Sequence, residues 1–394
     1  MKKRLFNIWM ALPLTALMLF FTTCYQADEN EAPIMQLPPL KDQFSAYFDI
    51  GNIFNPNDAG RSISNSRLTR HYNVLTAEND MKPDKLNPNR GSYNFSTANN
   101  MVNAARASGF KVVGHTLLWH SQIPAWQAAL RTDSTSREDA LRYMNEYITR
   151  VVGEFKERIY KWDVLNEVFP DGVSANGSWR TSMRSGPQGN PWFMKIGADF
   201  VYEGFLAARL ADPSAILYYN DYNMNNVGKS TMVRNMVRDV NVQYLANLPA
   251  IRAANPSVNL DRTEKLIEGI GMQGHHNTGV SADSIRAALN LFRPLGVRIS
   301  ISELDVLSQT WDEFDRQQAR PTDAGKARAA ELYGEYFTVF LENSDIIERV
   351  SFWGVYDEQS WRARGLPLIF EGISNTRPKA SYYKIIEALE AFRP

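Results

Sequence analysis

The segment SREDALRYMNEYITRVVGEFKERIYKWDVLNE (residues 136–167) predicts an amphipathic helix followed at once by a buried strand. We expect the helix over 136–158, because a serine with an acidic residue three positions later marks its start. Its apolar side chains form one stripe: Leu141, Met144, Ile148, Val151, Val152 and Phe155. The apolar run 159–165 then predicts a strand, with Asn166 and Glu167 at its carboxyl end. The segment therefore predicts one helix and one strand, with polar side chains where the strand stops.

The same alternation continues through the rest of the chain. Apolar, β-branched or aromatic runs predict strands at 46–50, 72–77, 112–118, 159–165, 215–219, 268–273, 297–302 and 349–355. Further helical patterns lie at 96–108, 198–211, 281–293, 326–342 and 380–392. Eight alternations predict an α/β protein of the (β/α)₈ TIM-barrel class. A doubly wound open sheet is the alternative, but it would normally carry a glycine-rich phosphate turn after an early strand, and the sequence has none.

Composition fits one large globular domain. The 394 residues contain 43 Lys and Arg and 43 Asp and Glu, so no net charge attracts nucleic acid, and we expect no nucleic-acid partner. The single cysteine excludes a disulfide framework within the chain and a cysteine-based metal cluster. No linker-like stretch interrupts the chain after about residue 41, and we expect a single domain over 41–394.

The amino terminus carries an export signal. Three basic residues at 2–4 precede an apolar run from Leu5 to Phe21, and we expect a signal peptide over 1–23. Cys24 stands where the apolar run ends and resembles the lipid-modified cysteine of bacterial lipoproteins, and the acidic stretch after it resembles the surface-export signals of the Bacteroides group. We expect Cys24 to be a lipid anchor, residues 24–40 to be a proline-stiffened tether, and the protein to be an outer-membrane lipoprotein at the cell surface. An ordinary cleaved signal, giving a secreted or periplasmic protein, is the alternative.

Polar side chains gather at or just after the ends of the predicted strands. They are Glu78 and Asn79, His115 to His120, Asn166 and Glu167, Asn220 and Asp221, Gln273 to His275, Glu303 to Asp305, and Trp353. In a parallel barrel these positions meet on the face that carries active sites. Carboxylate, amide, imidazole and indole groups together indicate acid–base and nucleophilic chemistry on a polar, flat-faced substrate such as a sugar. Glycoside hydrolysis needs two carboxyl groups, for which Glu167 and Glu303 are the best pair, although each could equally be a structural hydrogen-bond partner.

Seven segments, in order along residues 41–394, resemble glycoside hydrolase family 10, the endo-β-1,4-xylanases. They are TAENDMKP (76–83), HTLLWHSQIPAW (115–126), WDVLNE (162–167), LYYNDYN (217–223), GIGMQGHH (269–276), ISELDV (301–306) and FWGVYDEQSW (352–361). The resemblance implies a (β/α)₈ catalytic domain that hydrolyses xylan and xylo-oligosaccharides with retention of configuration and with neither metal nor organic cofactor. We expect a monomer that contacts a membrane only through its lipid.

The resemblance also implies roles for single residues. Glu167 resembles the acid/base and Glu303 the nucleophile, while His275 resembles the histidine that bonds the nucleophile and Asp305 the aspartate that orients this histidine. Asn166 resembles the asparagine that binds the sugar 2-hydroxyl. The remaining residues that resemble the substrate-binding set are Glu78, Asn79, Lys82, His115, Trp119, Gln273, Trp353 and Trp361. Adjacent strand residues face opposite ways, which disfavours a metal site formed by His275 with His276.

Other positions are expected outside the reacting centre. We expect structural or supporting roles for His120, Asn220, Asp221 and Asn223. The stretch 176–192 is longer than usual for the family, and we hypothesise that Trp179, Arg180 and Arg184 contact charged substrate decorations such as uronic acids. Two functional alternatives remain: another β-1,4 substrate, such as cellulose or short xylo-oligosaccharides, and a surface glycan-binding protein on an inactive barrel.

Overall fold

A computed structural model describes residues 33–60, 66–262, 264–316 and 320–393. The predicted signal peptide over 1–23, Cys24 and the first part of the predicted tether lie outside the described residues. Within those ranges, no helix is long and apolar enough to cross a membrane.

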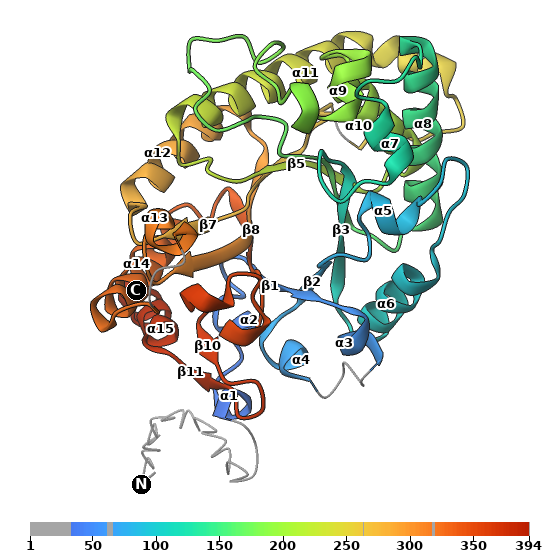
Figure 1. Ribbon diagram of the computed structural model, residues 1–394. Coiled ribbons are helices and arrows are strands. Elements are labelled where there is room, and N and C mark those ends of the chain that lie inside the picture. The colour runs from blue at the N-terminus through green and yellow to red at the C-terminus, as the bar shows by residue number, and fades with distance from the viewer. Residues whose placement is uncertain (1–32, 61–65, 263, 317–319, 394) are drawn as a thin grey trace, which may run out of the picture. The chain divides into compact units, whose positions relative to one another are not determined.

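Eight parallel strands of the described chain close into a barrel, which confirms the predicted (β/α)₈ fold (Figure 1). The strands are β1 (Asp49–Phe54), β2 (Val74–Ala77), β3 (Lys111–Leu118), β4 (Lys161–Asn166), β5 (Ile216–Asp221), β6 (Gly269–Met272), β8 (Arg298–Leu307) and β9 (Ile347–Phe352). Pairing of β6 with β8 and of β1 with β9 completes the ring. A short strand, β7 (His275–Asn277), pairs only with the second half of β8, beside Asp305, Val306 and Leu307.

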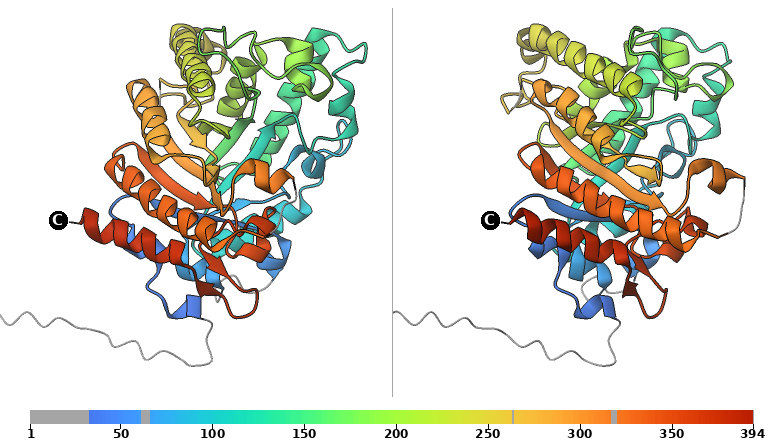
Figure 2. Two further views of the ribbon diagram at one scale, coloured as in Figure 1. Left: turned by 60° about the vertical axis from the view of Figure 1, so that its left-hand side comes forward. Right: turned by 90° about the vertical axis from the view of Figure 1, so that its left-hand side faces the viewer.

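Helices form the outer layer, as Figures 1 and 2 show. The longer ones are α6 (Ser96–Ala107), α8 (Arg137–Glu154), α10 (Phe200–Ala211), α11 (Val227–Ala254), α12 (Ala282–Phe292), α14 (Asp323–Glu342) and α15 (Ala380–Phe392). Shorter helices in the connections are α3 (Pro56–Gly60), α4 (Arg67–His71), α5 (Pro83–Leu86), α7 (Ala125–Ala129), α9 (Pro191–Ile196) and α13 (Trp311–Asp315). The last connection also holds a two-stranded hairpin, β10 (Phe370–Glu371) with β11 (Arg377–Pro378).

Helix α8 shows how the sequence produces one of these layers. The side chain of Ser136 accepts a hydrogen bond from the backbone N–H of Asp139 at 3.0 Å, which confirms the predicted helix start. Met144, Ile148 and Val151 are fully buried, and the helix packs against α10 and α9. Each such side chain contributes about 1.5–3 kcal/mol through removal of apolar surface from water. Helix α10 in turn contacts β4, so α8 supports this strand through α10.

Small and large side chains lie next to each other on neighbouring strands of the barrel. A Cβ atom on Gly114 of β3 would lie 2.2 Å from the ring of Trp162 on β4, and one on Gly269 of β6 would lie 2.0 Å from the ring of Tyr218 on β5. The aromatic rings thus occupy space that only glycine leaves free on the neighbouring strand. The barrel interior is a packed core, and the open end lies at the carboxyl ends of the strands.

The predicted tether ends too late in the sequence. Residues 33–43 form two short helices, α1 (Pro33–Gln36) and α2 (Leu40–Gln43), and the side chains of Ile34 and Leu40 are buried. The backbone N–H of Ile34 donates to the carbonyl of Thr376 at 2.9 Å. These apolar residues fit against segments distant in sequence, which a local count of prolines does not reveal. Residues 33–40 therefore belong to the folded domain, and the predicted boundary at 41 is too late.

Two element predictions also need correction. The first strand spans 49–54 and not 46–50, because Phe44 and Phe48 stack at 5.4 Å and pack on Phe337 as part of the core. Helix α11, 28 residues long, lies in a stretch without a predicted element. Its buried side chains are concentrated in its first half, and the later half exposes Val242 and Leu245, so no apolar stripe runs along its whole length.

Candidate active site

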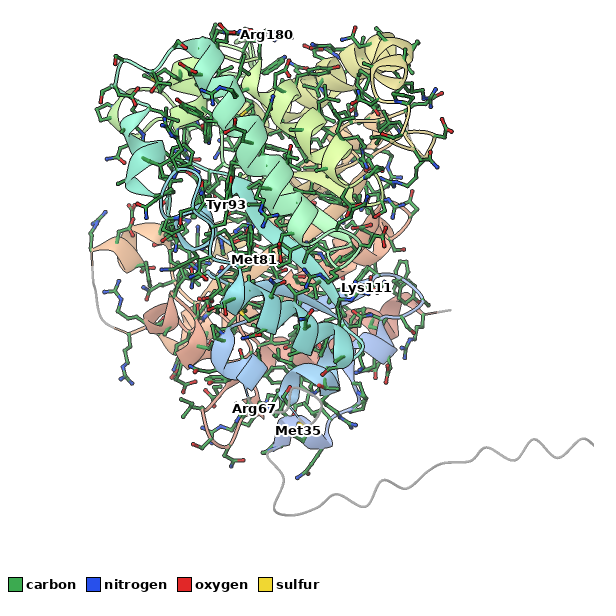
Figure 3. All side chains as sticks on the ribbon, turned by 90° about the vertical axis from the view of Figure 1, so that its right-hand side faces the viewer. Met35, Arg67, Met81, Tyr93, Lys111 and Arg180 are labelled. Carbon is green, nitrogen blue, oxygen red and sulfur yellow. The ribbon has the colours of Figure 1, made fainter. Side chains whose placement is uncertain are left out.

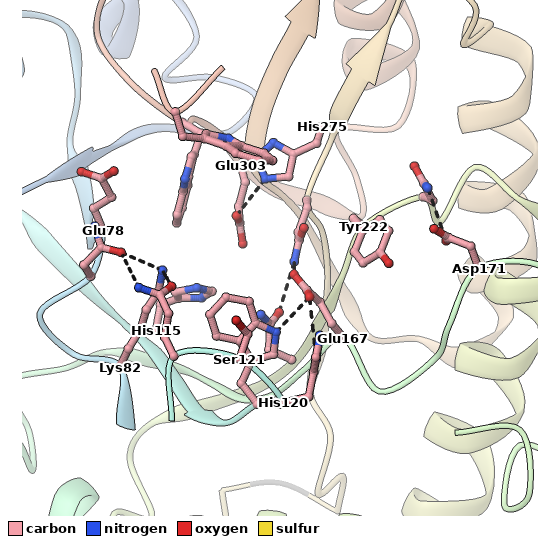
Figure 4. Close-up of a pocket in the computed structure, with 18 of the residues that line it drawn as sticks. Glu78, Lys82, His115, His120, Ser121, Glu167, Asp171, Tyr222, His275 and Glu303 are labelled. Carbon is pink, nitrogen blue, oxygen red and sulfur yellow. Dashed lines mark hydrogen bonds and ion pairs between the residues drawn. The ribbon is translucent and has the colours of Figure 1, made fainter. Parts of the chain in front are cut away.

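The predicted polar strand ends converge on one cavity of about 790 Å³ (Figure 4). Of the predicted site residues, the cavity is lined by Glu78, Asn79, Lys82, His115, Trp119, Asn166, Glu167, Gln273, His275, Glu303, Trp353 and Trp361. Asp305 lies fully buried behind His275, in contact with it. The expectation that these side chains share one face of the barrel is confirmed.

Glu303 is a buried carboxylate on β8 whose two oxygens have different partners. Nε2 of His275 lies 3.1 Å from Oε2, and Nδ2 of Asn220 donates to Oε1 at 2.8 Å. Burial alone would raise the pKa of Glu303, but the hydrogen bond from His275, the electrostatic effects of His115 and His275, and the hydrogen bond from Asn220 together outweigh burial and lower this pKa from 4.5 to about 2. Glu303 is therefore ionised at neutral pH, as a nucleophile must be.

A line of buried side chains holds His275 in place. Its Nδ1 lies 2.9 Å from Oδ1 of Asp305, and the guanidinium of Arg362 donates to the same aspartate. Burial lowers the pKa of His275, although the hydrogen bond to Glu303 opposes this effect. His276, the next residue, packs its ring on Tyr336 at 5.2 Å, away from the cavity. His275 thus keeps one orientation toward Glu303, and the two adjacent histidines do not share a site.

Glu167 follows β4 directly and is held at both its backbone and its side chain. Its φ of 55° is in the left-handed region, and its N–H donates to the carbonyl of Asn220 at 2.9 Å. Nε1 of Trp119 donates to Oε2 at 2.9 Å, and Nε2 of Gln273 donates to Oε1 at 2.9 Å. Nδ1 of His120 lies 4.0 Å from Oε2, and burial lowers the pKa of His120 to about 4, so this histidine is a neutral neighbour of the carboxyl group.

A hydrogen-bonded network connects the two glutamates. The side-chain amide of Asn166 lies 2.9 Å from Nδ2 of Asn220 and 3.2 Å from Nε2 of Gln273. Asn220 contacts Glu303 and Gln273 contacts Glu167, so three amides span the floor between the carboxyl groups. Asn220 belongs to the residues expected in a supporting role, and the structure gives it a direct hydrogen bond to Glu303.

Lys82 is a buried cation and not the surface charge that its sequence position would suggest in isolation. Its Nζ donates to Oδ1 of Asn79 at 3.0 Å and to Oε1 of Gln122 at 2.6 Å. Burial lowers the pKa of Lys82, while the nearby carboxylates of Glu303 and Glu78 oppose this. Burial likewise raises the pKa of Glu78. These groups form a polar wall on one side of Glu303, at the left of Figure 4.

Aromatic side chains complete this end of the cavity. Trp353 is buried and its ring centre lies 5.5 Å from that of His115, whose Nδ1 is 3.0 Å from Oδ2 of Asp163. Trp361 lies 5.3 Å from the ring of His275 and is 60% exposed, so most of its surface is free to contact a ligand. Two indoles and two imidazoles thus surround a narrow space beside Glu303.

One carboxylate held ionised and a second carboxyl group across the same cavity provide the two groups that glycoside hydrolysis requires. The sequence profile of glycosyl hydrolase family 10 matches residues 39–388. The chain belongs to this family.

Relatives and solved structures of family 10 cover most of the chain. An endo-1,4-beta-xylanase of Geobacillus stearothermophilus is 33% identical over 362 residues, which is 89% of this chain and 98% of that protein. Exoglucanase XynX of Acetivibrio thermocellus is 33% identical over 367 residues, 90% of this chain but 30% of that protein. A crystal structure of a family 10 xylanase with a bacterial Ig-like domain from termite gut is 49% identical with a TM-score of 0.81, covering 92% of this chain and 80% of that one.

The family 10 barrel also lines its cavity with residues that the sequence patterns did not single out. They are Ser121, Gln122, Asp171, Tyr222, Trp311 and Asp315, and Asn223, expected only as support, joins them. Tyr222 and Asp171 lie beyond Glu167, opposite the polar wall of Lys82 (Figure 4). Ser121, Gln122, Asp171 and Tyr222 stand in loops a few positions after a predicted strand, whereas Trp311 and Asp315 belong to helix α13, farther along the chain. A search for polar and aromatic residues in the first few positions after each predicted strand could have identified these loop residues.

The hypothesis for the long stretch 176–192 needs correction. Trp179 is buried, and its Nε1 donates to Oδ2 of Asp239 at 2.8 Å, so its ring cannot reach a substrate in the cavity. Arg180 lies over the Trp179 ring, with its guanidinium carbon 4.4 Å from the ring centre. The guanidinium of Arg184 is bonded to the backbone of Glu167 and to Tyr222. Trp179, Arg180 and Arg184 therefore contact other parts of the protein and do not line the cavity, so they do not form the predicted contacts with uronic acids.

Proposed function

We propose that the protein is a retaining endo-1,4-β-xylanase in which Glu303 is the nucleophile and Glu167 the acid/base. The observation that carries this assignment is the environment of Glu303, whose hydrogen bonds from His275 and Asn220 keep it ionised inside a buried site. Glu167 is on the facing strand end, and the basic side chain that lies within 4 Å of its carboxyl group among the described residues is His120, which is neutral. Family 10 has two catalytic glutamates, and we assign these roles to Glu167 and Glu303.

The reaction takes place in two displacements. In the first, Glu303 attacks the anomeric carbon while Glu167 gives its proton to the glycosidic oxygen, so the C–O bond breaks and a glycosyl ester forms. In the second, Glu167 accepts a proton from water, the water oxygen attacks the same carbon, and the ester bond to Glu303 breaks. Two inversions restore the starting configuration. Retention requires carboxyl groups about 5–5.5 Å apart, which is the separation we expect here.

The remaining cavity residues orient the sugar. Asn166 lies between the two glutamates, where its amide can bind the 2-hydroxyl of the sugar that reacts. The polar wall of Glu78, Asn79 and Lys82 offers donors and acceptors for further hydroxyl groups. Trp353 and Trp361 supply apolar surface for the flat face of a pentose ring. Xylan suits this site better than cellulose because the indoles leave little room for a hexose hydroxymethyl group.

The experiment compares wild type with Glu303→Ala on glucuronoxylan and on carboxymethyl cellulose. We expect wild type to release xylo-oligosaccharides from xylan alone, with the β-anomer as first product by NMR, and the variant to release none. Glu390→Ala, a change of an exposed glutamate on α15, is the matched control and should match wild type. Xylan binding without hydrolysis by wild type would instead indicate a glycan receptor on an inactive barrel.

We further propose that the enzyme is an exported lipoprotein anchored by Cys24 and active as a monomer. The basic start and apolar run that precede Cys24 support export. Labelling with a fatty-acid analogue in a bacterial host tests the anchor: wild type should incorporate label and Cys24→Ser should not. Equal labelling of both would refute the anchor, and a dimer in sedimentation experiments would refute the monomer.

A further inference from the structure

We propose that Arg184 is a positioning residue that fixes the acid/base Glu167 relative to the substrate's leaving group. The inference rests on the role of Glu167 in the proposed function and assigns a task to a residue of the long stretch 176–192. Arg184 contacts the backbone of Glu167 and a wall of the cavity at the same time, through different nitrogens of one guanidinium group.

The first contact is with the Glu167 backbone. Nε of Arg184 donates to the carbonyl oxygen of Glu167 at 3.0 Å, and the backbone N–H of Arg184 donates to the carbonyl of Val168 at 2.7 Å. Glu167 has a φ of 55°, a conformation that L-residues with side chains adopt rarely. On its other side, the Glu167 N–H is bonded to the carbonyl of Asn220. The unusual backbone of Glu167 is thus held by hydrogen bonds on both sides, and Arg184 donates one of these two bonds.

The second contact is with Tyr222, which lines the cavity beyond Glu167. A terminal nitrogen of Arg184 donates to the Tyr222 hydroxyl, and the guanidinium carbon lies 5.7 Å from the ring centre. Lys229 packs on the same ring with Nζ 3.7 Å from its centre, and this nitrogen is 2.9 Å from Oδ1 of Asp171. Two cations therefore clamp the tyrosine ring that forms the wall next to the acid/base.

The chemistry of arginine is needed for both contacts. The guanidinium donates in two directions from a rigid plane, whereas the single ammonium of lysine cannot reach two acceptors in this geometry. Burial alone would lower the pKa of Arg184, but Tyr222 and the carboxylates of Asp221 and Glu167 have the larger, opposite effect, and the pKa is raised above its ordinary value. The guanidinium group therefore stays charged. Loss of this residue would let Glu167 and Tyr222 move relative to each other without removing any group that reacts.

The expected effect is specific to proton donation. A misplaced Glu167 delivers its proton poorly to a glycosidic oxygen, and this matters only when the leaving group needs the proton. Dinitrophenolate leaves without protonation, while an unactivated phenol or a sugar hydroxyl does not. The ratio of kcat/KM for these two kinds of xylobioside therefore reports the placement of Glu167, since kcat/KM covers the steps up to the first covalent intermediate.

The test measures kcat/KM on dinitrophenyl and phenyl xylobiosides for wild type, Arg184→Ala and Arg184→Lys. We expect both variants to lose about 10-fold to 100-fold on the phenyl substrate, as for a catalytic group displaced by about 1 Å, and to lose far less on the dinitrophenyl substrate. Arg180→Ala is the matched control, because Arg180 lies in the same stretch with a side chain 45% exposed and a position at the edge of the molecule in Figure 3. It should behave as wild type on both substrates.

Glu167→Ala, measured beside these variants, tests the acid/base role of Glu167 separately from the positioning role of Arg184. If Glu167→Ala loses equally on both substrates, the acid/base assignment itself is wrong. If Glu167→Ala shows the leaving-group dependence but the Arg184 variants lose equally on both substrates, Arg184 is only structural and the inference is overturned. If Arg184→Ala does not fold, Arg184→Lys, which retains the charge and most of the side-chain volume, gives the deciding ratio.

Discussion

At the scale of single residues, the low pKa of Glu303 has a consequence for stability. Because the folded-state pKa of about 2 is below the ordinary value of 4.5, ionised Glu303 stabilises the fold above about pH 4.5, and this contribution is lost as the pH falls toward 2. The full contribution is on the order of 3 kcal/mol.

We therefore expect the unfolding free energy of wild type to fall relative to that of Glu303→Gln as the pH is lowered from 4.5 to 2. Between pH 5 and 7 the difference between the two unfolding free energies should stay constant. Urea unfolding at a series of pH values measures it. Parallel curves for the two proteins over the acidic range would show that the carboxylate is not stabilised as described.

The two tryptophans of the cavity should respond differently to truncation. Trp361 is 60% exposed and Trp353 is 7% exposed. We expect Trp361→Ala to change stability by no more than about 0.5 kcal/mol, while Trp353→Ala costs about 3–5 kcal/mol. Both variants should lose kcat/KM on xylan. Thermal unfolding together with xylan kinetics distinguishes them, and a large loss of stability in Trp361→Ala would contradict a ligand-facing role.

At the scale of elements, His71 at the end of α4 holds the first two helices. Its Nε2 lies 2.7 Å from the carbonyl of Ile34, and its Nδ1 accepts the backbone N–H of Leu40 at 3.4 Å. This pattern requires the neutral ring, and burial lowers the pKa of His71 from 6.5 to about 4. For a base with a lowered pKa, the stabilisation is complete above pH 6.5 and is lost progressively as the pH falls to 4.

We expect α1 and α2 to become the most acid-sensitive part of the described chain. Amide hydrogen exchange in residues 33–43 should accelerate between pH 6.5 and 4, after correction for intrinsic rates, and His71→Gln should remove this acid dependence. If the amide exchange rates of residues 33–43 depend on pH in the same way in wild type and in His71→Gln, His71 is not the cause of the acid sensitivity.

Strands and site residues could be predicted from the sequence to different degrees. The barrel strands are short runs of buried residues, and their polar ends coincide with the chemistry, so pattern and motif lead to the same positions. Helix α11 could not be predicted from an apolar stripe because its second half projects into solvent. The roles of Trp179 and Arg184 could not be predicted, because the sequence shows a tryptophan or an arginine but not whether Asp239 or Tyr222 already binds it.

At the scale of the whole molecule, segments from the two ends of the described chain close the barrel together. Nη2 of Arg393 donates to the carbonyl of Gln43 at 3.0 Å, and the rings of Tyr47 and Phe392 lie 5.6 Å apart. Ile34 is bonded to Thr376 nearby in the last connection. The final helix thereby holds the segment that leads into the first strand.

A chain that starts at residue 33 should therefore unfold like the full-length protein and hydrolyse xylan at the same rate. A chain that starts at residue 45 loses Ile34, Leu40 and Phe44, all buried, and we expect a melting temperature several degrees lower or aggregation on expression. Differential scanning calorimetry on both chains measures this. Equal melting temperatures would mean that residues 33–44 are dispensable for the fold.

The left-handed backbone of Glu167 also bears on how this enzyme could be evolved in the laboratory. A glutamate in that conformation costs about 1–3 kcal/mol, whereas glycine adopts it freely. Libraries selected only for heat resistance should therefore be enriched in Glu167→Gly, a variant expected to melt higher than its parent while it has lost the acid/base. Selection must include turnover at every round, because at this position durability and catalysis favour different amino acids.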